Sequence, residues 1–172
     1  MMINKDDIIA DFNKAFDALV NAIKLFDGKD FNKIPFDDSW TAGQVVQHIV
    51  LANDGFDGVL NAEVKDTERP FDELKSQLKS IFLNFGTKMK SPEFILPALK
   101  DYDKDRHILK IENIRNGILK GINDLDLTKT CMSFELPGLG HLTRYEAIYF
   151  VIYHTERHTH QLNEIYKFLK TN

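Results

Sequence analysis

The chain has 172 residues, 43% hydrophobic and 28% charged, which suits an ordinary globular protein with a sizeable buried core. Its net charge of −4 and its lack of a dense Lys/Arg run argue against nucleic-acid binding, because an acidic protein gains nothing from counterion release. No apolar run approaches a membrane span of about 20 residues, no signal-peptide pattern opens the chain, and the single cysteine, Cys131, cannot form an internal disulfide. We therefore expect a cytoplasmic protein that does not enter membranes.

The first predicted helix runs from about Lys5 to Phe26. Its apolar residues recur at helical spacing, and Gly28 follows just after the expected end. The apolar stripe consists of Ile8, Phe12, Ala15, Phe16, Leu19, Ala22, Ile23 and Phe26. This pattern predicts an amphipathic helix with the stripe on the core.

The second predicted helix begins after Trp40. Thr41 is followed three residues later by Gln44, which is a capping-box pattern. The apolar stripe of this helix consists of Val45, Ile49, Ala52, Phe56 and Val59. The pattern predicts one helix that continues as far as Val59.

A weaker helix is predicted over about Phe71 to Met89, and Pro92 and Pro97 mark the long connection after it. The next strongly periodic segment runs from about Asp103 to Asp124. Its stripe consists of Ile108, Ile111, Ile114, Ile118 and Ile122. A long connection at this place allows the crossover that some four-helix bundles contain.

The last predicted helix follows a turn at Pro137–Gly140 and runs to about Leu169. Thr143 and Glu146 form a second capping-box pattern at its start. Only Ser133–Leu136 looks extended, and the chain has no internal repeat or flexible linker. These patterns predict an all-α fold with four long helices in a single domain over residues 1–172.

Two histidines in the last helix carry the main chemical signal. Advancing about 100° per residue, His154 and His158 fall within the apolar stripe, whereas Tyr149, Glu156 and His160 fall on the outside. Histidines at positions i and i+4 place both imidazoles over one spot, as a metal ion needs.

A third ligand must come from another helix, and His48 is the candidate because it lies beside the apolar stripe of the second helix. Three neutral imidazoles leave one or more coordination positions open, as in catalytic zinc sites. Histidine ligands suit Zn, Ni, Cu or Fe. The alternative from spacing alone is that these histidines are core residues with structural hydrogen bonds.

Two familiar metal-site patterns are excluded. A metalloprotease helix needs Glu directly after the first His, and that position is Thr155. A carboxylate-bridged di-iron site needs Glu-x-x-His pairs, and this chain contains none.

Five other residues are weaker candidates for the site. His107 could be a fourth ligand, although we expect it to be a half-exposed histidine near the start of a helix. His141 is expected in the turn before the last helix, and nothing in the sequence marks Cys131 as a nucleophile. Gln44 and Gln161 lie one turn from expected ligands and could orient their imidazoles.

The segments that carry these residues resemble motifs of a known family. Leu136–Thr143, Ala147–His154 and His158–Leu162 resemble the closing motif of the DinB-like superfamily. Ser39–His48 resembles its first motif, an aromatic residue before a helix that carries a histidine. The likeness extends over roughly residues 5–170, but only these two motifs are specific.

This resemblance implies an up-down-down-up four-helix bundle with His48, His154 and His158 as the metal ligands. The weaker helix predicted over about Phe71 to Met89 would be an extra helix in the crossover. Gln161 matches a frequent family glutamine, and family members are often homodimers. Relatives include thiol-dependent S-transferases, a thiol-dependent isomerase and proteins described as metal-dependent hydrolases. Around the last ligand this chain departs from many relatives at Arg157, Thr159 and His160, so a relative's substrate preference does not carry over.

Two classes of function stay open. In the first, the protein is an enzyme with one divalent metal, zinc or nickel, which activates a bound water or a low-molecular-weight thiol against a small-molecule substrate. The resemblance alone favours the S-transferase version over the hydrolase version, and no general base is identified. In the second, the protein is a non-catalytic binding module with a structural metal or a small-ligand pocket.

Overall fold

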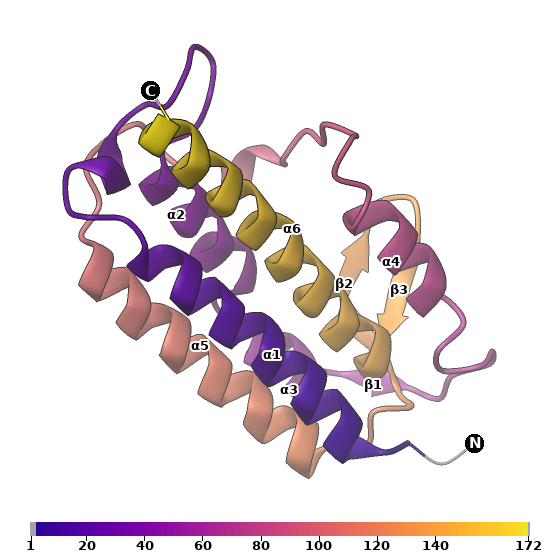
Figure 1. Ribbon diagram of the computed structural model, residues 1–172. Helices are drawn as coiled ribbons and strands as arrows, with labels where there is room; N and C mark the ends of the chain where they lie inside the picture. The colour runs from indigo at the N-terminus through magenta and orange to yellow at the C-terminus, as the bar shows by residue number, and fades with distance from the viewer. Residues whose placement is uncertain (1–2, 172) are drawn as a thin grey trace.

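The computed structural model describes residues 3–171, which are mostly helical (Figure 1). The long helices are α1 (Lys5–Lys24), α2 (Ala42–Asn53), α5 (Lys104–Asp124) and α6 (Arg144–Thr171). Helices α1 and α2 each pack against both α5 and α6. In Figure 1, α1 lies between α5 and α6, and α2 lies behind them. The core side chains therefore meet between these four helices.

Helix α1 confirms the first predicted stripe. Its start is capped by Asn4, whose side chain accepts a hydrogen bond from the backbone N–H of Asp6. All eight predicted stripe residues are buried. They belong to one continuous hydrophobic cluster that α2, α5 and α6 also line. No helix within residues 3–171 is both long and apolar enough to cross a membrane.

The prediction of one helix as far as Val59 is wrong. The capping box of Thr41 and Gln44 forms as expected, but α2 ends at Asn53 and a short helix α3 (Phe56–Asn61) follows. Gly55 separates the two with a φ of 80°, a left-handed conformation that glycine adopts without strain. The break redirects the chain so that Leu60 is buried, and its carbonyl accepts a hydrogen bond from Nε of Arg144.

The all-α prediction is also corrected, because a small antiparallel sheet accompanies the helices. It contains β1 (Val64–Lys65), β2 (Thr130–Leu136) and β3 (Gly140–Thr143) in the order β1-β2-β3. The expected turn at Pro137–Gly140 is the loop of the β2–β3 hairpin, with positive φ at Gly138 and Gly140. Strands of two and four residues are too short to show an alternating pattern, which is why the sequence indicated only Ser133–Leu136.

The weak helix of the crossover is shorter than predicted. Helix α4 covers Lys75–Phe82 and packs on α6, and the chain then runs without regular structure to a 3-10 turn, η2 (Glu93–Ile95). A further 3-10 turn, η1 (Asp30–Asn32), lies before α2. In α5, the predicted stripe is fully buried at Ile111, Ile118 and Ile122 but only partly at Ile108 and Ile114.

A buried carboxylate attaches the start of α6 to the crossover. Glu146 accepts hydrogen bonds from both terminal nitrogens of Arg69, at 2.6 and 2.7 Å, and from the backbone N–H of Leu74 at 2.8 Å. It also closes the predicted capping box, because its carboxylate accepts from the N–H of Thr143 at 2.9 Å. Four donors therefore satisfy one fully buried charge.

Replacing Arg69 with alanine should destabilise the protein, because Glu146 would keep a buried charge without its cationic partner. Breaking a buried pair typically costs about 3–5 kcal/mol, and we expect about 3 kcal/mol because Arg69 is 25% exposed. Denaturant unfolding would measure the loss. Lys120→Ala removes an exposed ion pair with Asp124 and should change stability little, so equal losses in the two variants would contradict the assignment.

Candidate metal centre

The structure brings together the three histidines that the sequence singled out. His48 comes from α2, and His154 and His158 come from α6, with one ligand atom of each within 4.8 Å of the others. Their relative exposures are 1%, 6% and 8%. Three polar rings so deep in the interior need partners for their nitrogens, because unpaired polar groups are costly to bury.

The histidines meet through their Nε2 atoms. Nε2 of His154 lies 3.2 Å from Nε2 of His48 and 3.1 Å from Nε2 of His158. The spacing within α6 is a local property of the helix, whereas the approach of His48 depends on the packing of α2 against α6. The site is therefore shared by two helices.

Hydrogen bonds at the opposite ring nitrogens define two of the three tautomers. Nδ1 of His48 lies 2.9 Å from the carbonyl oxygen of Ile95, and Nδ1 of His158 lies 2.9 Å from Oε1 of Gln161. A carbonyl oxygen only accepts, so both Nδ1 atoms carry the proton and both Nε2 atoms present a lone pair. These are the outer contacts that orient imidazoles toward a metal ion.

The donor set fits a divalent cation. A proton on Nε2 of His154 can bridge to one neighbour at a time, which leaves a second pair of nitrogens in contact without a bond. A metal ion accepts all three lone pairs, and tetrahedral geometry with bonds of about 2.0–2.1 Å places such nitrogens about 3.3 Å apart. The observed separations are close to that value. This buried three-histidine group could hold a metal ion.

Burial keeps the three imidazoles neutral, which is the state in which they can bind a metal. Burial, followed by the neighbouring His48, lowers the pKa of His158 to about 3. Burial and then the other two imidazoles lower the pKa of His154 well below its usual value. The pKa of His48 is also lowered by burial, although the Ile95 carbonyl opposes the shift.

Aromatic rings surround the group. The ring of Trp40 lies 5.2 Å from that of His48, and the rings of Phe150 and Phe82 lie 5.7 and 6.0 Å from that of His154. Nδ1 of His154 has no hydrogen-bond partner among the residues that the structure describes. Aromatic side chains thus form part of the walls of the site, and Nδ1 of His154 is buried away from water.

The other two candidate histidines lie outside this group. The expectation of a half-exposed His107 is wrong, because the ring is buried and its nitrogens contact the Asp103 carbonyl and the Gln47 side chain, each at 2.7 Å. Gln47 on α2 covers the ring, a contact between helices that periodicity within α5 does not reveal. His141 lies on β3 rather than in a loop, and its Nδ1 contacts the Phe134 carbonyl at 3.0 Å.

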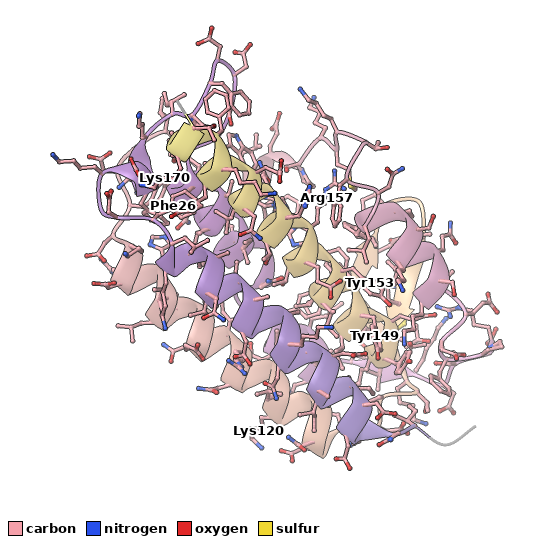
Figure 2. The ribbon with its side chains drawn as sticks, in the orientation of Figure 1. Phe26, Lys120, Tyr149, Tyr153, Arg157 and Lys170 are labelled. Carbon is pink, nitrogen blue, oxygen red and sulfur yellow. The ribbon has the colours of Figure 1, made fainter. Side chains whose placement is uncertain are left out.

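The predicted outer face of α6 is partly covered. Tyr149 was expected outside but is buried, and its hydroxyl donates to Asp11 of α1 at 2.9 Å. Figure 2 labels Tyr149 and Tyr153 on α6, and both are buried where α1 and α4 pack on this helix. Glu156 is half-buried, with its pKa raised by burial, and His160 is exposed as predicted.

The remaining predictions concern the side chains of Gln161, Gln44 and Cys131. Gln161 contacts a site histidine as expected, whereas Gln44 does not, because its side chain closes the capping box with Thr41. Cys131 is buried, which raises its pKa to about 11 and agrees with its exclusion as a nucleophile. The sequence did not identify Ile95 as a residue that contacts the site. Its contribution is a backbone carbonyl in an irregular segment, and no residue type marks such a contact.

Comparison with known protein families relates the chain to one of them. A family model described as the DinB superfamily matches residues 11–162, a span that contains all three histidines. Comparison with curated proteins and with solved structures gave no match.

The metal-free protein should lose stability as the pH falls from about 7 to about 5. The folded pKa of each site histidine lies below the unfolded value of about 6.5, so the unfolded chain binds protons that the folded chain does not. Denaturant unfolding at several pH values, in the presence of a chelator, would measure the slope.

The His158→Gln variant has one fewer of these groups and should show a shallower dependence on pH over the same range. A wild-type unfolding free energy that stays constant between about pH 7 and about pH 5 would contradict the neutral, buried state of the three rings.

Proposed function

The chain belongs to the DinB superfamily, and from this membership and the three-histidine group we propose that it is a metal-dependent enzyme. His48, His154 and His158 would hold one divalent ion, zinc or nickel, that acts on a small-molecule substrate. The observation that carries the proposal is the convergence of three Nε2 atoms in a buried site, two of them with lone pairs directed by bonds at Nδ1.

The ligand count supports an open site over a closed one. Structural zinc sites usually have four protein ligands, whereas catalytic sites have three and keep a position for water or substrate. Within residues 3–171, no fourth His, Cys, Asp or Glu joins the group. His107, the other buried histidine of that region, is engaged by Asp103 and Gln47.

When bound, the metal would lower the pKa of a coordinated water or thiol and so supply a nucleophile at neutral pH. The residues of the chain would orient and shield this centre. Ile95 and Gln161 hold the rings of His48 and His158, and the aromatic side chains around the site would strengthen electrostatic interactions by excluding water. No side chain is assigned as general base.

Family resemblance favours transfer of a low-molecular-weight thiol to an electrophilic substrate, with hydrolysis as the other reaction class. The up-down-down-up four-helix bundle and the homodimer belong to the same proposal. The packing of α1 and α2 against both α5 and α6 supports the bundle.

A non-catalytic binding module is the second candidate, and the burial of the site favours it. The histidines are at most 8% exposed, and two surface pockets of the protein are lined by other residues. One pocket lies between α5 and the segment that joins α2 to α3, and the other lies beside β2. An enzyme with this site must therefore open to admit its substrate.

The purified protein should contain about one equivalent of zinc or nickel, and His48→Ala should lose it, because two imidazoles from a single helix form a weaker site. Elemental analysis would measure both proteins. His160→Gln changes a histidine on the exposed side of the same helix and should keep the metal. Equal metal content in wild type and His48→Ala would refute the three-ligand site.

Reconstitution with Co²⁺ would separate the two functions. An open position should admit β-mercaptoethanol as a thiolate, which adds a sulfur-to-cobalt charge-transfer band to the visible spectrum. A closed structural site should give the same spectrum with and without the thiol. The His48→Ala protein, which should lose the three-histidine site, is treated in parallel and controls for cobalt and thiol binding elsewhere.

A further inference from the structure

Arg157 binds the segment that follows α4. Its guanidinium donates to the backbone carbonyls of Phe82 at 3.1 Å, of Asn84 at 2.9 Å and of Thr87. Figure 2 labels Arg157 on α6, beside this part of the chain. We refer to residues 83–95 as the strap. All three acceptors are main-chain oxygens at or near its beginning, so one side chain ties the start of the strap to α6.

The strap ends at the metal centre. Ile95 is its last residue, and its carbonyl accepts the Nδ1–H of His48 at 2.9 Å. The turn η2, which contains Ile95, contacts α2. The strap therefore links Arg157, the sequence neighbour of one site histidine, to the ring of another histidine on a different helix.

Little apolar burial holds the strap in place. Phe85, Met89 and Phe94 are exposed, Phe94 to 82%, and η2 contains no buried residue. A segment with few buried side chains opens at low cost unless polar contacts retain it. Stacking of Phe85 on His160, with ring centroids 4.1 Å apart, adds one more contact to α6. The guanidinium supplies most of the hydrogen bonds between the strap and α6.

We infer that Arg157 is a positioning residue for the metal centre, because it holds the strap whose Ile95 carbonyl orients His48. This inference rests on the proposed metal-binding function. An arginine suits the task, since its planar guanidinium has five N–H donors and can serve several carbonyls at once. Within residues 3–171, Arg157 has no carboxylate partner, and its guanidinium hydrogen bonds go to the strap and to Phe82.

The test compares wild type with Arg157→Lys and Arg157→Ala. Lysine keeps the positive charge but cannot donate to three carbonyls at once. The lysine variant therefore still tests the inference if the alanine variant folds poorly. Arg115→Ala is the matched control. Arg115 also makes three guanidinium hydrogen bonds, to Asn13 and Asp17, but these join α5 to α1 away from the strap.

Three measurements follow the strap, the ring and the metal in turn. Hydrogen exchange at the Thr87 and Ile95 amides, which are bonded within the segment, should accelerate in both Arg157 variants. Nitrogen chemical shifts of the metal-free proteins should show His48 changing from the Nδ1–H form to a mixture of tautomers. Competition with a chromophoric chelator should show Zn²⁺ affinity reduced about tenfold, the typical loss when an outer contact to a ligand is removed.

Arg115→Ala should leave all three readings at the wild-type values. If the Arg157 variants exchange faster at the strap but keep the wild-type His48 tautomer and Zn²⁺ affinity, Arg157 is a purely structural contact and the inference is overturned. Failure of the proposed function looks different, because wild type itself would then bind no Zn²⁺. The His48 tautomer, measured without metal, would in that case still decide whether Arg157 positions the ring.

Discussion

Three neutral imidazoles converge between α2 and α6, and this arrangement constrains much of the surrounding structure. Nitrogen lone pairs that face one another at 3.1–3.2 Å in an apolar interior repel unless a proton or a cation lies between them. Holding them there requires two helices in fixed positions and outer hydrogen bonds that select the tautomers. The lowered pKa values have the same origin, because burial disfavours the charged form of each ring.

Other helices cover two faces of α6. One face carries His154 and His158 toward α2, and the other carries Tyr149 toward Asp11 of α1. The contacts that attach the crossover to this helix include those of Glu146 near its start and of Arg157 further along. The crossover thereby does more than connect α3 to α5, because its far end also supplies the carbonyl that contacts His48.

The disagreements between pattern and structure have two causes, a local break at Gly55 and contacts between segments distant in the sequence. Periodicity correctly predicted the buried stripe of α1, but it extended the second helix through Gly55, where a left-handed residue redirects the chain. It placed Tyr149 outside because a helical wheel describes one helix and not the α1 and α4 that cover it. The short strands β1 and β3 form because β2 pairs with both, and such pairing leaves little local pattern.

The sequence by itself determined the long helices, the i, i+4 histidine pair and its place on the core face of α6, because these depend on geometry within one helix. It also identified His48 and Gln161, which lie on periodic segments near the expected ligands. Tertiary structure alone decided that Ile95 and Arg157 support the site, since both act through the path of an irregular segment. It likewise decided that His107 is buried away from the group, because that depends on how α2 packs against α5.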